Sequence, residues 1–209
     1  DPDCVPLREY LAPLPQRLDA FEWELCRIRS YQTIIFPINW KVALEAFVEA
    51  YHVTGTHPQL LRWGHGAPKP IDAGPLHGAH SGSRDYKFDG SAEFTDPRKY
   101  LASTAENTYH QLHGLYHDEG LAAVRRLQTE VPEGASLQEV QAAFFAFRRE
   151  EMIKAGARYP EHLTPAHLQA IEWLIFPNSS VLPSVERAFW YRSRPNGDDP
   201  DSTIFDVWS

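Results

Sequence analysis

The chain has 209 residues, which is enough for one domain with a substantial hydrophobic core. Its 28 acidic and 20 basic residues give a formal net charge of −8, which argues against nucleic acid or an anionic membrane surface as a partner. No apolar run approaches the ~20 residues of a membrane-spanning helix, and we expect a globular protein that does not associate with membranes.

The two cysteines, Cys4 and Cys26, are too few for a disulfide framework. We expect both to be reduced, as thiols are in the cytoplasm, and the sequence has no signal-peptide pattern at its start. The sequence therefore predicts a cytoplasmic protein.

The first segments predict a linker followed by strands. Residues 1–16 contain four prolines and are expected to be a linker packed on the surface. Phe21, Trp23 and Leu25 alternate with acidic residues, which predicts a strand, and the run 31–36, rich in Ile and aromatic residues, predicts a second.

Residues 39–58 (NWKVALEAFVEAYHVTGTHP) form the stretch around which we expect the protein to be organised. As a helix that ends near Val53, it places Glu45, Glu49 and His52 on one face, because they are four and three residues apart. Large apolar residues beside that face indicate burial, and buried charges need a partner or a metal. For Glu45 we expect a structural role in the core.

His57 follows His52 by five residues. The intervening Thr54-Gly55-Thr56 and the following Pro58 predict that the chain folds back after the helix and brings His57 toward His52. Two imidazoles and a carboxylate with open positions are the ligand set of non-heme Fe(II) oxygenases. Zinc also fits two histidines and an acid.

Residues 62–98 are rich in Gly, Pro, Ser and Asp and predict loops with short strands at 78–84 and 85–88. The segment also contains three histidines, for which solvated loop positions are the general expectation: His65, His77 and His80. A loop histidine near a metal pocket can instead orient a substrate or donate a hydrogen bond.

A second group of histidines, spaced three and four residues apart, lies in 103–128: His110, His113 and His117. On one continuous helix this would be a better metal pattern than the His52 pair. Gly114 and Gly120 are expected to interrupt that helix, and its polar neighbours indicate an exposed face. We interpret the segment as surface helix, and whether its histidines bind anything stays open.

The later segments predict two helices and then strands. A capping box of Ser136 and Glu139 opens a helix over 136–155 that Gly156 ends, and Thr164-Pro165 opens another that runs to Ile175. Antiparallel strands are predicted at 179–183, 188–194 and 203–209, with a turn at 196–201. This order of elements predicts the α+β class.

The residue order in 39–58 is specific. The stretch resembles the motif of the catalytic domain of the large (alpha) subunit of Rieske non-heme iron aromatic-ring-hydroxylating oxygenases. The likeness rests on NWK, E-x-F, E-A-Y-H and, after four residues, H-P. The likeness continues more weakly at 10–14 and 176–178, and Ala46 stands where the family often has Asn. The resemblance implies that His52 and His57 bind Fe(II). It also implies that Glu49, where many members have Asp, bridges the iron to the Rieske cluster of a neighbouring subunit.

The resemblance implies a helix-grip (START/Bet v 1-like) fold with a helical insert, in which the antiparallel sheet wraps round a long helix. Phe47, Val53 and Trp63 are the expected pocket walls. The implied activity is O2-dependent hydroxylation or dihydroxylation of a hydrophobic, aromatic substrate. Electrons would come from a 2Fe–2S cluster supplied by NAD(P)H through a reductase or ferredoxin, in a homotrimer or an alpha3beta3 assembly.

Residues 1–209 are then expected to be the catalytic mononuclear-iron domain of a longer chain. Cys4 and Cys26 have no histidine nearby, so the Rieske cluster, which needs two of each, is expected upstream. The resemblance implies that the third iron ligand is an aspartate on a C-terminal helix beyond Ser209. Asp206 and the turn acids Asp198, Asp199 and Asp201 look like ordinary surface carboxylates. Without both segments the chain is expected to be inactive.

Two alternatives of a different class stay open. The first is a zinc-dependent hydrolase that uses His52, His57 and an acid. The second is a helix-grip domain that binds an apolar ligand without catalysis, because a fold alone does not establish a function.

Overall fold

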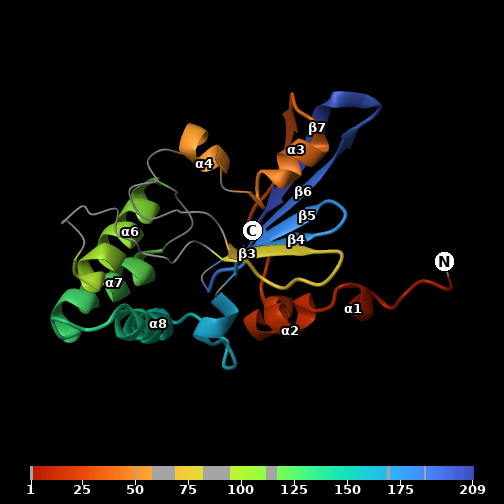
Figure 1. Cartoon of the computed structure of the whole chain (residues 1–209). Coiled ribbons are helices and arrows are strands. Elements are labelled where there is room, and N and C mark those ends of the chain that lie inside the picture. Colours follow the sequence, from red (N-terminus) through yellow and green to blue (C-terminus); the bar gives the residue numbers. More distant parts are fainter. Residues whose placement is uncertain are drawn as a thin grey trace. The chain divides into compact units, whose positions relative to one another are not determined.

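The computed structural model describes residues 2–49, 51–57, 69–81, 95–111, 117–168, 170–185 and 187–209. The chain divides into two compact units. The first, which we call the sheet unit, consists of Asp1–Arg84, His162–Ser184 and Ala188–Ser209. The second, the helical unit, consists of Asp85–Glu161 and Val185–Arg187 (Figure 1).

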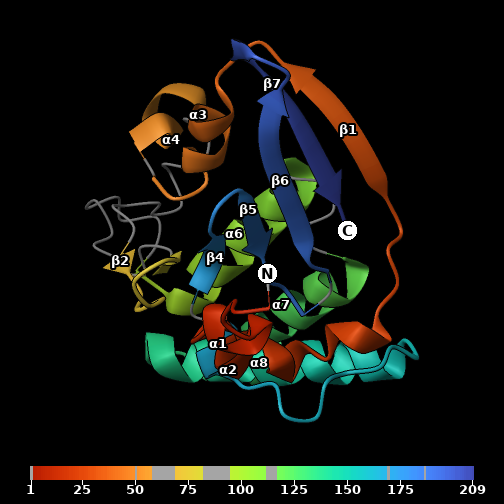
Figure 2. The same ribbon diagram turned by 90° about the vertical axis from the view of Figure 1, so that its right-hand side faces the viewer.

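The sheet unit is built on an antiparallel sheet, which in the described residues has seven strands in the order β1–β7–β6–β5–β4–β3–β2. The strands are β1 (Tyr31–Phe36), β2 (Lys69–Pro70), β3 (Gly78–Ser81), β4 (Ala170–Ile175), β5 (Ser179–Leu182), β6 (Phe189–Asn196) and β7 (Asp199–Trp208). The first strand pairs with the last, and Figure 2 shows β1, β7 and β6 side by side. The α+β prediction is confirmed, with its antiparallel sheet and helical insert.

The β6–β7 hairpin forms where the turn signal stands, although its turn is shorter than predicted. Gly197 has a φ of 63°, which suits glycine, and β7 begins at Asp199 rather than at Thr203. The predicted strands at 31–36 and 179–183 correspond to β1 and β5. The strand predicted at 78–84 is β3 as far as Ser81; residues 82–84 and the strand at 85–88 lie outside the described residues.

One face of the sheet carries the short helix α3 (Trp40–Glu45). Asn39 opens this helix, because its side chain accepts the Lys41 backbone N–H at 2.9 Å. Two strand side chains then hold the helix entry: Ser193 Oγ donates to the Trp40 carbonyl and Thr203 Oγ1 to the Ile38 carbonyl, both at 2.6 Å. We call this side of the sheet the α3 face.

Trp23, from the N-terminal part of the chain, packs against the opposite face of the sheet. The sequence did not predict the structure of this segment. Residues 19–25 are two 3-10 turns, η1 (Asp19–Phe21) and η2 (Trp23–Leu25), so the strand prediction here is wrong. Glu22 between them has a left-handed φ of 53°. Phe21 and Trp23 therefore stack on one another at 5.2 Å, and Trp23 meets Trp190 of β6 edge-on at 5.6 Å.

Two other local predictions are also wrong. Residues 1–16 are not a surface linker throughout, since the chain forms α1 (Leu7–Tyr10) and α2 (Leu14–Leu18), in which Leu14 is buried. The helix predicted from Thr164 to Ile175 is a 3-10 turn, η4 (Pro165–Leu168), followed by β4. A short apolar run reads equally as a buried strand, and pairing of β4 between β3 and β5 decides the outcome.

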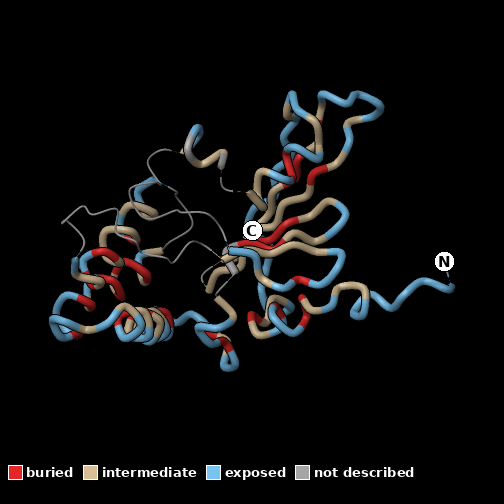
Figure 3. Tube along the Cα trace, viewed as in Figure 1, coloured by how far each residue is buried: buried red, intermediate tan, exposed pale blue. Residues whose placement is uncertain are grey.

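In the described residues of the helical unit, three helices pack together: α6 (Pro97–Gln111), α7 (Asp118–Glu130) and α8 (Leu137–Lys154). Their contact residues form one apolar cluster, visible as buried segments in Figure 3: Ala105, Ala123, Val124, Leu127, Val131, Val140 and Phe144. The capping box of Ser136 and Glu139 is confirmed, and Gly156 with φ 82° follows the end of α8. Gly120 does not interrupt a helix but is buried inside α7.

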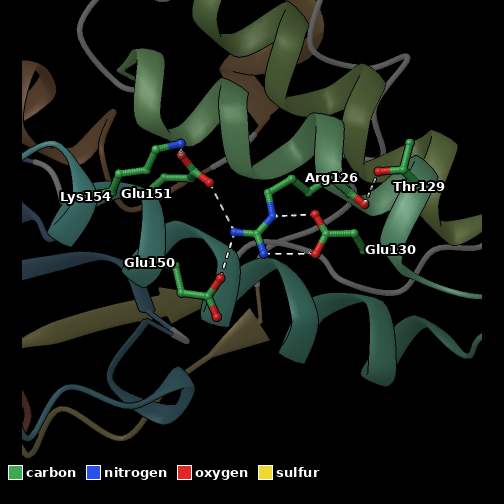
Figure 4. A network of polar contacts seen from close by, with 6 residues as sticks. All are labelled: Arg126, Thr129, Glu130, Glu150, Glu151 and Lys154. Atoms are coloured by element: carbon green, nitrogen blue, oxygen red, sulfur yellow. Dashed lines mark hydrogen bonds and ion pairs between the residues drawn. The ribbon is translucent and has the colours of Figure 1, made fainter.

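Polar contacts join α7 to α8 at Arg126 (Figure 4). Its guanidinium lies 2.7 Å from Glu130 of its own helix, and 2.8 and 3.1 Å from Glu150 and Glu151 of α8. The same group lies 4.0 Å from the centre of the Phe147 ring. The arginine therefore combines ion pairing with aromatic stacking at the helix contact.

Both cysteines are free thiols at the surface. None of the helices in the described ranges is long and apolar enough to cross a membrane. In the described part of the sheet unit the longest helices have six residues, so the long helix of a helix-grip arrangement stays a prediction.

Candidate metal centre

The 39–58 stretch forms two short helices rather than one. α3 ends at Glu45, and α4 runs over Tyr51–Thr56. Between them the Phe47 ring stacks on Tyr191 at 4.5 Å and on Phe205 at 5.8 Å, both on the α3 face of the sheet. Glu45 is exposed, so its expected place in the core is wrong.

Glu49 contacts His52 through both carboxylate oxygens. Oε2 accepts the backbone N–H of His52 at 3.0 Å, and Oε1 lies 2.5 Å from its Nδ1. The first contact satisfies a free N–H group in the first turn of α4. The second places the imidazole proton on Nδ1, which leaves Nε2 with a lone pair that can bind a metal.

His57 approaches His52, although by a different route from the one predicted. α4 continues past Val53 to Thr56, and the backbone N–H of His57 donates to the Val53 carbonyl at 3.0 Å. The prediction that the helix stops near Val53 is therefore wrong. The two imidazole rings nevertheless lie with their centres 5.5 Å apart and their planes at 79°.

This arrangement fits two of the three ligands of a metal site. Two half-buried imidazoles stand together, and one of them is oriented through Nδ1 by a carboxylate that is 17% exposed. Imidazole nitrogens suit Fe(II) and Zn(II) alike. Within the described ranges no group of three or more His, Cys, Asp or Glu side chains is arranged so that it could hold a metal ion. The metal-binding roles of His52 and His57 stay predictions.

The three residues expected to line a pocket lie in different settings. Phe47 packs on the sheet as described, Val53 is half-buried in α4, and Trp63 lies outside the described residues. Their part in a pocket stays a prediction.

Two of the loop histidines are not solvated, contrary to expectation. His77 accepts the Phe176 backbone N–H at Nδ1 (3.2 Å), so Nε2 carries the proton and donates to the Tyr10 carbonyl at 2.9 Å. His80 lies on β3, and its Nε2 is 3.0 Å from the Phe47 carbonyl oxygen. His80 thus ties a strand to the turn between α3 and α4. His65 lies outside the described residues.

The second histidine group is divided between two helices. His110 is exposed near the end of α6, and His117 immediately precedes α7. His113 lies outside the described residues. The expected interruption of the helix is confirmed at His117, whose backbone is extended immediately before α7.

Asp206 is not a surface carboxylate, as the sequence suggested, but is fully buried on β7. Arg192 and Arg194 of β6 donate to its Oδ2, and Tyr31 and Thr33 of β1 donate to its Oδ1. Burial acts to raise the pKa of Asp206, but these hydrogen bonds outweigh it and hold the pKa well below its usual range. Asp198, Asp199 and Asp201 are exposed, as expected.

Comparison with known proteins gives one family and a few relatives. Residues 21–209 match the family model described as ring hydroxylating alpha subunit (catalytic domain). Glycine betaine monooxygenase oxygenase subunits of Pseudomonas aeruginosa and Chromohalobacter salexigens are 33% and 34% identical over 54 and 53 residues, which are 26% and 25% of this chain. The aligned segments span only 13% and 12% of those relatives.

A solved structure also aligns with the chain. It is naphthalene 1,2-dioxygenase from Rhodococcus sp. bound to indole, aligned over 100% of this chain and 41% of that chain. The sequence identity is 17% and the TM-score 0.43.

Proposed function

Because the chain belongs to the ring-hydroxylating alpha subunits, as their catalytic domain, we propose that it is the mononuclear-iron part of an O2-dependent oxygenase. The observation that supports the proposal is the pair of imidazoles of His52 and His57, 5.5 Å apart, with Glu49 held to the first of them. The proposed reaction is hydroxylation or dihydroxylation of a hydrophobic, aromatic substrate.

The proposed roles follow the contacts. His52 would bind Fe(II) through Nε2 and His57 through its imidazole, while Glu49 fixes the ring of His52 through Nδ1. The iron supplies the site at which O2 is activated. Each oxygen of a carboxylate can accept more than one hydrogen bond, so contact with His52 leaves Glu49 able to accept another from a neighbouring subunit. This supports the bridging role proposed for Glu49.

The remaining parts of the proposal concern the longer protein. The chain spans less than half of the solved dioxygenase chain it aligns with. We propose an aspartate C-terminal to Ser209 as the third iron ligand and a 2Fe–2S cluster in a domain N-terminal to the chain. Electrons would reach the cluster from a reductase or ferredoxin, in a cytoplasmic homotrimer or alpha3beta3 assembly.

The test is anaerobic loading with Fe(II), addition of nitric oxide and EPR spectroscopy. We expect a high-spin iron–nitrosyl signal from the chain or from a form extended past Ser209, lost in His52→Ala and in His57→Ala. His110→Ala is the matched control, because His110 is an exposed histidine of the helical unit. An unchanged signal in His52→Ala would contradict the assignment.

The same experiment separates the alternatives. Stoichiometric zinc with no nitrosyl signal in either form would favour a zinc hydrolase. An apolar ligand bound with neither metal would favour a binding domain without catalysis.

A further inference from the structure

Glu172 is a buried carboxyl group that the proposed metal chemistry does not use. It lies on β4 and is 4% exposed. Ser180 of β5, which is fully buried, donates its hydroxyl to Oε1. Burial raises the pKa of Glu172 well above its usual value, and the hydrogen bond from Ser180 only partly opposes this. Burial therefore favours the neutral, protonated form of Glu172.

The strand register places Glu172 on the α3 face. Its partner across the β3–β4 pair is His80, and directly opposed residues of antiparallel strands project to the same face. The imidazole of His80 reaches the Phe47 carbonyl, on the segment that leads to Glu49 and His52. Glu172 thus shares a face with the turn that precedes the candidate metal centre.

A second pairing leads to the same face. Ser180 is opposed by Tyr191 across the β5–β6 pair, and the Tyr191 ring stacks on Phe47 at 4.5 Å. Burial raises the pKa of Tyr191, and the charge that Glu172 would carry if ionised raises it further. The carboxyl, the tyrosine and Phe47 are therefore neighbours.

In its protonated form the carboxyl group of Glu172 can donate a hydrogen bond. A neutral carboxylic acid that accepts a hydrogen bond at one oxygen retains an O–H on the other. Tyr191, on the same face, belongs to an aromatic cluster, because Phe47, Phe189 and Phe205 stack on it. A few donors placed among apolar groups are the feature by which binding sites fix the orientation of a ligand.

We propose that Glu172 determines substrate specificity by donating a hydrogen bond to a neutral carbonyl or ether oxygen of an otherwise apolar substrate on the α3 face. This inference rests on the proposed function for the presence of a substrate. It adds a substrate class: aromatic ketones and ethers are bound in preference to plain hydrocarbons of the same shape.

The test compares two ligands of one shape, 1-indanone and indane, by isothermal titration calorimetry on the full chain. The measured quantity is the ratio of their dissociation constants in each variant, so that differences in their hydration cancel. We expect 1-indanone to be preferred, and the preference to fall about tenfold in Glu172→Leu, as for the loss of a hydrogen bond to a buried group. Glu172→Gln is the matched control, because its amide keeps a neutral donor and the preference.

A pH series gives a second measurement. Because the raised pKa keeps the acid neutral at low pH, the preference of the wild-type chain should decline as pH rises through that pKa. His80 and Tyr191 are the other titratable groups that face Glu172 from β3 and β6. Both remain in Glu172→Gln, whose preference should not decline in this way. If Glu172→Leu does not fold, judged by circular dichroism, this comparison decides alone.

The proposal is overturned by an unchanged preference in a folded Glu172→Leu, by the same pH course in wild type and Glu172→Gln, or by no binding of either ligand. The iron–nitrosyl experiment uses no organic ligand. Absence of any preference for 1-indanone in the wild-type chain, with an intact nitrosyl signal, would therefore overturn the role of Glu172 alone. The converse would overturn the iron assignment alone.

Discussion

Glu49 holds His52 at two atoms of the same residue, its backbone N–H at 3.0 Å and its Nδ1 at 2.5 Å. One carboxylate thereby fixes both the start of α4 and the direction of the ring that α4 carries. Rotation of the ring and displacement of the backbone are both opposed. The direction of the lone pair on Nε2 is thereby fixed as well.

Replacement of Glu49 by alanine should weaken Fe(II) binding by about 10- to 100-fold, the usual cost of losing the group that orients a ligand histidine. The measurement is competition of the chain with a chromogenic Fe(II) chelator under anaerobic conditions. Glu45→Ala is the matched control, since Glu45 is an exposed glutamate at the end of α3. Equal affinities in the two variants would show that Glu49 does not orient the site.

Asp206→Asn should destabilise the sheet unit. The carboxylate is fully buried between two arginines whose side chains are 41% and 39% exposed. Breaking a buried pair costs about 3–5 kcal/mol. Because these arginines can turn to water, we expect about 2–3 kcal/mol by urea unfolding. Asp201→Asn, at an exposed position near the β6–β7 turn, is the control and should change stability little.

The same residue predicts a pH dependence. The folded-state pKa of Asp206 is held low, so its stabilising contribution is fully present above its unfolded-state pKa, about 4, and is lost as pH falls below that value toward the folded-state pKa. The difference in unfolding free energy between wild type and Asp206→Asn should therefore shrink below about pH 4. A difference that stays constant down to pH 2 would be inconsistent with an ionised Asp206.

The elements that were predicted correctly have strong local signals. β1 follows from its composition, α8 from a capping box and a following glycine, and the β6–β7 hairpin from Asn196-Gly197. In 19–25 and 164–175, partners distant in sequence decide the structure. Trp23 turns toward Trp190, and Trp173 enters a strand between β3 and β5. No local pattern contains that information.

The residues of the candidate site also differ in how far local sequence predicts their positions. Glu49, His52 and His57 lie within nine residues, so their grouping could be inferred from their spacing and from the sequence motif. The settings of His80, Glu172 and Asp206 depend on strand register over long sequence separations, and Asp206 looks like a surface acid until its two arginines are placed opposite. The sequence signal for a buried acid was the presence of Arg192 and Arg194 two residues apart, and so on one face of a strand.

Arg126→Ala should loosen the contact between α7 and α8. Single exposed ion pairs contribute only about 0.2–1 kcal/mol, but this guanidinium pairs with several acids and covers Phe147 (Figure 4). We expect a loss of about 1–2 kcal/mol in thermal or urea unfolding, of which added salt reproduces only the ionic part. Arg125→Ala, the neighbouring exposed arginine, should be nearly neutral. If both variants lose the same stability, the network contributes nothing beyond surface charge.

His80→Leu should cost about 1–3 kcal/mol, because the Phe47 carbonyl loses its donor in a partly buried setting. His80→Gln keeps an N–H donor of similar reach and should recover part of that loss. The measurement is urea unfolding of both variants, with His110→Leu as the control for replacing a histidine by an apolar residue. Because the bond reaches the turn between α3 and α4, the leucine variant should also alter the lineshape of the iron–nitrosyl signal, and the glutamine variant should restore it. A stability loss with an unchanged lineshape would mean that His80 supports the sheet without positioning His52.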